Sequence, residues 1–194
     1  MLTKDEFYNG LQEIEKPLVR MYQAILEEAK PKIVLEVGSG WGLFSRSVMD
    51  HTDAKEITLD KIAGYGLAQF EKNTDGFQDR IERIVEDSHT LLPRMEVDWK
   101  EKFDVIFVDG DHTQDGAAKD LSQAWPLLKP GGTMLVDDVF HKSNWHCFKH
   151  EIGEFNFGVT RALWGFIQAK YEEFDEQPGI FPVAHGVVVI RKKA

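Results

Sequence analysis

Acidic residues stand at or beside the ends of five short apolar runs in this sequence. They are Glu36, Asp60, Asp87, Asp109 and the pair Asp137-Asp138. In an open parallel sheet, ligands bind beyond the carboxyl ends of the strands, where a carboxylate can accept hydrogen bonds or bind a cation. A single aspartate in such a place is usually a turn residue. Acids at all five places favour a binding site along one sheet edge.

Three glycines at alternate positions follow the first of these acids. The segment reads E-x-G-x-G-x-G, with Ser39 and Trp41 between Gly38, Gly40 and Gly42. Glycine lets the chain turn sharply and lets a ligand approach the backbone. A dinucleotide site requires G-x-G-x-x-G, but Leu43 occupies the place of its third glycine, which argues against NAD. The other interpretation is a tight strand-to-helix turn without a ligand.

Strands and helices alternate around these residues. Strands are expected at 32–37, 56–60, 81–86, 103–109, 133–137 and 186–190, and helices near 42–50, 62–73, 116–127 and 159–174. Residues 4–29 have the periodicity of two further helices, and 129–132 (K-P-G-G) reads as a loop. Nearly continuous apolar strands separated by helices predict an α/β doubly wound, mostly parallel sheet with an antiparallel C-terminal edge. We expect one domain, with N-terminal helices at 1–30, a binding part at 31–139 and an acceptor-side part at 140–194.

Composition narrows the class of partner. The chain has 194 residues and a net charge of −10, with 33 acidic against 23 basic residues. A nucleic-acid binder normally has a basic face, so a small molecule is the expected partner and nucleic acid is not. No apolar run reaches the ~20 residues of a membrane span, and residues 3–15 do not resemble a signal peptide. The single cysteine, Cys147, fits a reducing compartment such as the cytoplasm. The sequence leaves the oligomeric state open, a homodimer included.

The E-x-G-x-G-x-G segment resembles the first motif of class I S-adenosylmethionine (SAM) methyltransferases. That resemblance implies a Rossmann-like sheet of seven strands. It implies that Glu36 helps to hold the methionine end of SAM and that the loop from Gly38 to Gly42 passes beneath it. Asp60 would accept hydrogen bonds from the two ribose hydroxyls, unless it only caps the next helix. Asp87, Ser88 and His89 would line the adenine, although Asp87 or Ser88 could equally be a helix N-cap.

Two further segments, F-D-V-I-F-V-D-G-D-H at 103–112 and L-L-K-P-G-G-T-M-L-V-D-D at 127–138, resemble the metal-dependent O-methyltransferases. This group includes the catechol and macrocin types. The resemblance implies that Asp109, Asp137 and Asp138 bind Mg²⁺ and that Asp109 also lies beside the cofactor. Carboxylate oxygens are hard ligands that suit Mg²⁺. The alternative is a solvated acidic rim without a metal.

The resemblance also implies that His112, three residues after Asp109, takes a proton from the acceptor. Histidine suits this role because its ordinary pKa is about 6.5. An aromatic segment after the aspartate pair could form the wall of an acceptor pocket or only pack against the next helix; it contains Phe140, His141, Trp145, His146, Phe148, Phe155 and Phe157.

The sequence therefore predicts a SAM-dependent methyltransferase that needs Mg²⁺ and methylates oxygen on a small molecule with neighbouring hydroxyls, phenolic or sugar. Two alternatives stay open: a metal-independent N- or C-methyltransferase, and a SAM-binding module without catalytic activity.

Overall fold

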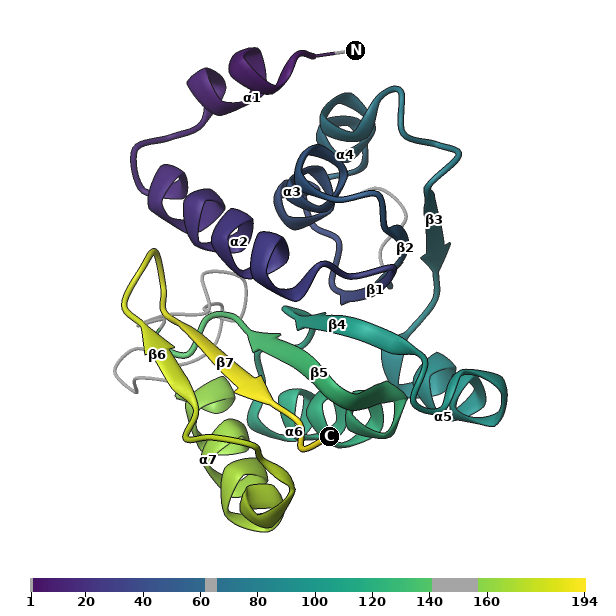
Figure 1. Cartoon of the computed structure of the whole chain (residues 1–194), viewed down its shortest axis with the longest axis vertical. Coiled ribbons are helices and arrows are strands. Elements are labelled where there is room, and N and C mark those ends of the chain that lie inside the picture. Colours follow the sequence, from purple (N-terminus) through teal and green to yellow (C-terminus); the bar gives the residue numbers. More distant parts are fainter. Residues whose placement is uncertain (1, 62–65, 141–156) are drawn as a thin grey trace, which may run out of the picture.

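The computed structural model describes residues 2–61, 66–140 and 157–194, and its centre is one mixed sheet (Figure 1). In spatial order the strands are β3 (Ile81–Val85), β2 (Lys55–Asp60), β1 (Ile33–Val37), β4 (Phe103–Val108), β5 (Leu128–Val136), β7 (Val187–Arg191) and β6 (Gly179–Phe181). The first five are mutually parallel, while β7 runs antiparallel to both β5 and β6. This arrangement confirms the predicted doubly wound sheet of seven strands with an antiparallel C-terminal edge.

The strands form where the sequence is rich in Val, Ile and Leu because both faces of the sheet are buried. On β1, Val34 packs into one hydrophobic cluster, and Leu35 and Val37 pack into a second cluster on the opposite face. Side chains alternate between the faces of a strand, so a strand that is covered on both sides buries side chains on both faces and is mostly apolar. The same reasoning accounts for β4 and β7.

Helices cover the two faces, as Figure 1 shows. On one side lie α1 (Lys4–Gly10), α2 (Glu15–Ala29), α3 (Leu43–His51) and α4 (Leu67–Thr74); on the other lie α5 (Ser88–Trp99), α6 (Gln114–Ala124) and α7 (Gly158–Lys170). Short 3₁₀ turns, Trp125–Leu127 and Tyr171–Glu173, follow α6 and α7. No helix in the described part of the chain is long and apolar enough to cross a membrane.

Two parts of the sheet differ from the sequence prediction. The segment Lys129-Pro130-Gly131-Gly132, predicted as a loop, lies inside β5, which begins at Leu128. Its pairing with β4 shifts register between Phe103 and Val105, which accommodates the breaker residues. Strand β6 was not predicted, because three residues are too few to show a period-2 pattern.

The strand registers bring the predicted site residues to one edge of the sheet. Val37 at the end of β1 is the register partner of Leu59 on β2 and of Val108 on β4. Val108 in turn pairs with Val136 on β5. The residues that follow these strand ends therefore lie next to one another, although they are up to about a hundred positions apart in the sequence.

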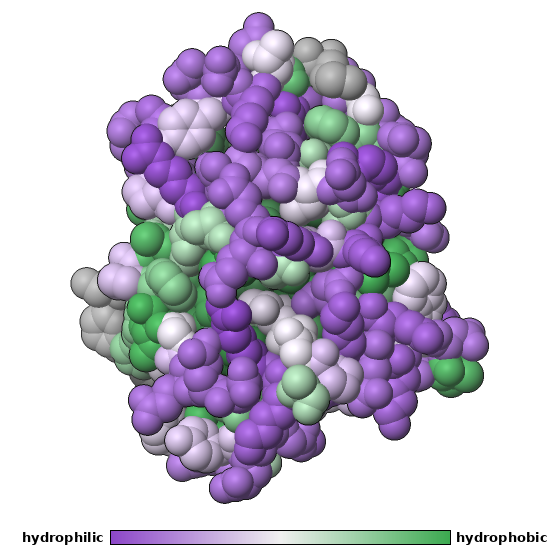
Figure 2. Space-filling view, in the orientation of Figure 1, coloured by the Kyte–Doolittle hydropathy of each residue, from purple (hydrophilic) through white to green (hydrophobic). Residues whose placement is uncertain are grey.

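The molecular surface around this fold is mostly hydrophilic. On the face drawn in Figure 2, hydrophobic side chains gather mainly along the left margin, over the edge strand β6. Ile180 and Phe181 of this strand are exposed. No broad basic area is expected on a chain with this excess of acidic residues, in line with a small-molecule partner.

Candidate active site

The loop between β1 and α3 contains three glycines, and each of them has different surroundings. All three glycines have positive φ, 93° at Gly38, 43° at Gly40 and 74° at Gly42. A Cβ on Gly38 would collide with the backbone carbonyl of Asp109, and one on Gly42 would meet the ring of Phe70. A Cβ on Gly40 would meet no described residue within 4 Å. The loop is therefore held against β4 at its start and against α4 at its end, while the described residues leave room at its centre for a ligand to lie against the backbone.

Glu36 lies beneath this loop and not in it. Its side chain is 1% exposed, and its Oε2 accepts hydrogen bonds from the hydroxyls of Ser45 and Thr58, each at 2.6 Å. Burial raises the pKa of Glu36 to about 8, against the opposing effect of these two hydrogen bonds. The structure thus places the Glu36 side chain between Ser45 at the start of α3 and Thr58 on β2; its contact with the methionine end of SAM stays a prediction.

Asp60, at the end of β2, meets the loop through Ser39. The Ser39 hydroxyl donates to Asp60 Oδ2 at 2.9 Å, and Arg83 Nη2 lies 3.5 Å from the same oxygen. Arg83 Nε also donates to the Ser39 hydroxyl at 3.1 Å. These contacts hold the carboxylate at the strand end, where a ribose could reach it. Trp41, on the same loop, is 46% exposed.

The segment after β3 adopts the helix-cap arrangement that the sequence left open. Asp87 is the N-cap of α5, and its side chain accepts a hydrogen bond from the His89 backbone N–H at 2.9 Å. The Ser88 hydroxyl donates to Asp120 on α6 at 2.6 Å, and His89 Nε2 lies 3.3 Å from the same carboxylate oxygen. Asp120 Oδ2 also accepts from the backbone N–H of Asp111 at 3.1 Å. The buried Asp120 therefore connects the predicted adenine segment to the loop that carries Asp109.

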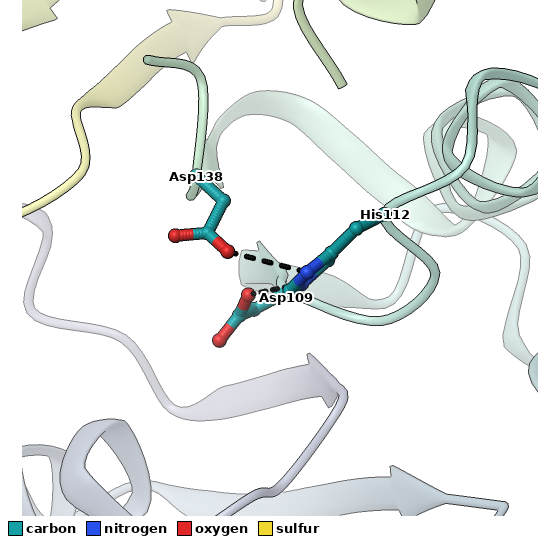
Figure 3. A group of neighbouring side chains, drawn as sticks. All are labelled: Asp109, His112 and Asp138. Carbon is teal, nitrogen blue, oxygen red and sulfur yellow. Dashed lines mark hydrogen bonds and ion pairs between the residues drawn. The ribbon is translucent and has the colours of Figure 1, made fainter. Parts of the chain in front are cut away.

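Asp109, His112 and Asp138 come together at the ends of β4 and β5 (Figure 3). His112 lies between the two acids: its Nε2 is 3.2 Å from Asp109 Oδ1 and its Nδ1 is 3.3 Å from Asp138 Oδ2. One ligand atom from each of the three residues lies within 4.8 Å of the others. All three side chains are partly accessible, so a ligand can reach them.

Asp137, the third predicted metal ligand, is adjacent but more deeply buried. It is 8% exposed, and its Oδ2 accepts a hydrogen bond from the Tyr22 hydroxyl at 3.0 Å. Its Oδ1 accepts from the backbone N–H of Asp138 at 2.7 Å. The ring of Tyr22 is fixed by edge-on contacts with Phe44 and Phe107. Helix α2 therefore contributes a residue to the site, which its amphipathic pattern alone could not reveal.

The charges in this cluster are unbalanced. Burial, and then the neighbouring carboxylates of Asp109 and Asp138, raise the pKa of Asp137 to about 8. Burial also raises the pKa of Asp109, although its hydrogen bond with His112 opposes that effect. The same hydrogen bond, reinforced by Asp138, raises the pKa of His112 to about 9. Three carboxyl groups so close together favour a positive charge among them.

The cluster fits a divalent cation by the chemistry of its donors. Two carboxylates and an imidazole each offer one ligand atom, and these three atoms lie within 4.8 Å of one another. Carboxylate oxygens suit Mg²⁺, and imidazole is tolerated by several divalent metals. The structure gathers Asp109 and Asp138 as predicted and adds His112 to the set, while Asp137 faces Tyr22.

A second histidine, His185, was missed by the sequence analysis. It lies on the turn between β6 and β7, and its Nδ1 is 3.1 Å from Asp138 Oδ1. No motif surrounds it, and it is 47 positions from its partner, so only the sheet order could have revealed the contact. Of the predicted aromatic segment, Phe140 and Phe157 are described and exposed. The others, His141, Trp145, His146, Phe148 and Phe155, lie outside the described residues, as does Cys147.

Comparison with known proteins gives this geometry a family. Residues 35–139, which are 105 of the 194 residues, match the family described as "Methyltransferase domain". The matched stretch runs from β1 to the residue after the aspartate pair. No curated protein matches the sequence.

Solved structures share the fold at low sequence identity. The O-methyltransferase TomG of Streptomyces achromogenes, involved in tomaymycin synthesis and solved with SAM, has 14% identity and a TM-score of 0.75, with 100% of this chain and 92% of that chain covered. A putative caffeoyl-CoA O-methyltransferase of Staphylococcus aureus has 16% identity and a TM-score of 0.73, with 95% and 87% covered. The methyltransferase PaMTH1 of Podospora anserina, solved with S-adenosylhomocysteine (SAH), has 22% identity and a TM-score of 0.71, with 99% and 83% covered.

The glycine loop after β1, Asp60 at the end of β2 and the order of the strands are consistent with the methyltransferase match over residues 35–139. The chain belongs to the methyltransferase-domain family and is a class I SAM-dependent methyltransferase.

Proposed function

We propose that this enzyme transfers a methyl group from SAM to a hydroxyl of a small molecule with neighbouring hydroxyls, and that it needs Mg²⁺ to do so. The observation that carries the proposal is the group of Asp109, His112 and Asp138 at the ends of β4 and β5. This group borders the glycine loop, because Gly38 packs against the backbone of Asp109. A base and a pair of metal-binding acids thus lie beside the expected position of the methyl donor.

Asp109 and Asp138 would hold the ion, with Asp137 completing the protein ligands. Bound Mg²⁺ would lower the pKa of an acceptor hydroxyl and fix its orientation. Two neighbouring hydroxyls supply two oxygens to such an ion, which favours a phenol or sugar of that kind. Tyr22 keeps the Asp137 carboxylate in place from the buried side.

His112 receives the proton in this proposal. The acceptor oxygen forms a bond to the methyl carbon while the bond from that carbon to sulfur breaks, so that the sulfonium becomes a neutral thioether. The proton of the hydroxyl goes to His112, and the net products are the methyl ether, SAH and one proton. Positioning of the two reactants and neutralisation of the developing charge supply most of the rate in such a transfer.

The binding of SAM is proposed to use the loop from Gly38 to Gly42, with Asp60 on the ribose and the segment from Asp87 to His89 beside the adenine. Open space above Gly40 supports the first contact. The position of Asp60 at the end of β2, next to Ser39 of the loop, supports the second. Related folds described as O-methyltransferases favour oxygen as the methylated atom. We place the reaction in the cytoplasm, in line with the single cysteine.

One observation favours a second candidate, a metal-independent methyltransferase acting on nitrogen or carbon. His112 already contacts both carboxylates, and as an imidazolium it would supply the positive charge that they favour. In that case the acids would tune the histidine and no ion would be needed.

The test is turnover of SAM with a panel of small molecules after removal of metal by EDTA and after addition of Mg²⁺. We expect activity only with Mg²⁺ and only with acceptors that carry neighbouring hydroxyls. Asp109→Asn should lose Mg²⁺-stimulated turnover, while Asp53→Asn, an exposed aspartate outside the site, serves as the control. Full activity after exhaustive chelation, or methylation of an amine in preference to a diol, would establish the second candidate.

A further inference from the structure

We infer that His185, on the turn between β6 and β7, is a positioning residue that fixes the carboxylate of Asp138. The inference rests on the proposed function, because Asp138 is one of the acids proposed to bind the ion. His185 is assigned no contact with SAM or with the reacting atoms. It acts through Asp138.

Asp138 needs such a support because little else in the described structure holds its side chain. Its backbone has φ 58°, in the left-handed region that few residues other than glycine adopt. Its two carboxylate oxygens point to different histidines: Oδ2 lies 3.3 Å from His112 Nδ1 and Oδ1 lies 3.1 Å from His185 Nδ1. His112 is itself placed for chemistry, so it cannot serve only as an anchor. His185 is then the contact that fixes the second oxygen.

The turn that carries His185 has a fixed position relative to the end of β5. The backbone N–H of Phe140 donates to the His185 carbonyl at 2.7 Å, and the N–H of Val139 donates to the Gly186 carbonyl at 3.0 Å. Gly186 has φ 90°, and a Cβ there would collide with the Phe140 ring. The backbone after Asp138 and the turn thus form one unit. The imidazole is therefore brought to Asp138 by the chain and does not depend on the ion pair for its position.

This arrangement makes the β6–β7 hairpin part of the active-site edge. The hairpin lies on the antiparallel side of the sheet, and His185 is 47 positions from Asp138 in the sequence. The side chain of His185 is 48% exposed, so it contributes little to the hydrophobic core and can be replaced without opening a cavity. A positioning role can therefore be separated from a role in stability.

The atom that makes the contact provides a sharp test. In asparagine the amide nitrogen occupies the place of His Nδ1 along the side chain, whereas in glutamine it lies one bond farther, nearer to Nε2. His185→Asn can therefore donate to Asp138, and His185→Gln and His185→Ala cannot do so from the same position. His51→Ala is the matched control, because His51 Nδ1 lies 3.3 Å from Glu27 on the other side of the molecule.

The experiment measures Mg²⁺ affinity by calorimetry on each SAH-loaded full-length variant, together with a crystal structure of each. We expect the Ala and Gln variants to bind Mg²⁺ about 10–100-fold more weakly, the usual effect of losing a residue that orients a metal ligand. The Asn variant and the His51→Ala control should bind as the wild type does. Asp138 should keep its orientation in the Asn variant and rotate in the other two. SAH affinity should stay unchanged in all variants, and the melting temperature should stay unchanged in the three His185 variants.

Equal Mg²⁺ affinity in all His185 variants, or an Asn variant no better than Ala, overturns the inference. A wild-type protein that binds no Mg²⁺ overturns the proposed metal function instead. The crystal structures then decide the inference by themselves: rotation of Asp138 in the Ala and Gln variants but not in the Asn variant supports positioning, and an unmoved Asp138 in all three contradicts it.

Discussion

The two halves of the active-site edge differ in how their acids are satisfied. The cofactor half is formed by the glycine loop and the ends of β2 and β3. There each acid has hydrogen-bond donors of its own and does not share them with another acid of the site. Asp60 accepts from Ser39 and faces Arg83, and Asp87 caps its own helix. In the metal half, at the ends of β4 and β5, Asp109, Asp137 and Asp138 meet one tyrosine and two histidines.

This difference indicates which half depends on a ligand. A carboxylate that already has its hydrogen bonds is arranged before SAM arrives, which lowers the cost of ordering the site on binding. Carboxylates that lie close to one another raise each other's pKa and gain most from an added positive charge. We therefore expect the metal half to respond strongly to pH and to divalent ions, and SAM binding by the cofactor half to be independent of divalent ions.

The largest effect is expected at His112. His112→Ala should lower kcat by about 10²–10⁴-fold, the usual contribution of a general base, and should leave SAH affinity unchanged. The pKa of His112 is raised to about 9, first by its hydrogen bond with Asp109 and also by Asp138. A base must be unprotonated, so at low Mg²⁺ the wild-type rate should rise with pH up to about 9. A divalent ion on the acids offsets their negative charge and should move this rise to lower pH.

The measurement is kcat against pH at low and saturating Mg²⁺, with a weakly acidic alcohol as acceptor. Such an acceptor depends most on the base. If His112→Ala keeps wild-type turnover with it, His112 is a structural residue of the loop, and the two halves do not differ in the way described.

An intermediate effect is expected at Asp60 in the cofactor half. Asp60→Ala should weaken SAM binding by about 1.5–3 kcal/mol, the range for hydrogen bonds to a charged group. Mg²⁺ affinity should not change, because no contact joins Asp60 to the metal half among the described residues. Calorimetry with SAH and with Mg²⁺ measures both quantities on one protein.

Ser39→Ala is the control for this variant, since it removes the internal hydrogen bonds of the Ser39 hydroxyl with Asp60 and Arg83 and leaves the Asp60 carboxylate in place. A loss as large for Ser39→Ala as for Asp60→Ala would mean that the pair shapes the loop and that Asp60 does not bind the ribose. NAD should not compete with SAM in either protein.

The residues of each half could be predicted from the sequence only where contacting residues lie close together along the chain. The cofactor half is encoded within short stretches, the loop from Glu36 to Gly42 and single residues at strand ends, so spacing alone indicates it. In the metal half, Asp109 and His112 are similarly close. Tyr22 and His185 are 115 and 47 positions from their partners. On α2, Tyr22 has the pattern of an ordinary core residue, and only the packing of that helix over β4 and β5 brings its hydroxyl to Asp137.

The fold was predictable for a related reason. Strands that are buried on both faces have a strong apolar pattern, and the parallel β-α alternation leaves few topologies open. The three-residue strand β6 and the Pro-Gly-Gly segment inside β5 lack that pattern. Their pairing is decided by neighbouring strands, which a local reading of the sequence cannot include.

The smallest effect is expected on stability, at Glu56. This residue lies near the start of β2, the strand that ends at Asp60, and tests whether a buried charge remains below the cofactor half. Glu56 is 1% exposed, and neither of its carboxylate oxygens makes a hydrogen bond with a described residue. Burial, and then the nearby Glu36, raise its pKa well above the ordinary value. The folded protein therefore keeps a proton on Glu56 that the unfolded chain loses at about pH 4.5, so the free energy of unfolding should fall as pH rises above that value.

Glu56→Gln has no proton to lose and should remove this part of the pH dependence. Relative to wild type, the variant should gain at most ~1.4 kcal/mol between pH 6 and pH 7, because one proton changes the free energy of unfolding by no more than ~1.4 kcal/mol per pH unit. Urea denaturation at several pH values measures the difference, and the exposed Glu82→Gln on the adjacent strand should show none. Parallel stability curves for Glu56→Gln and wild type would mean that Glu56 is ionised and paired in the folded protein. Turnover should not change in the variant, because Glu56 supports the sheet below the loop and does not contact the open side where SAM is proposed to bind.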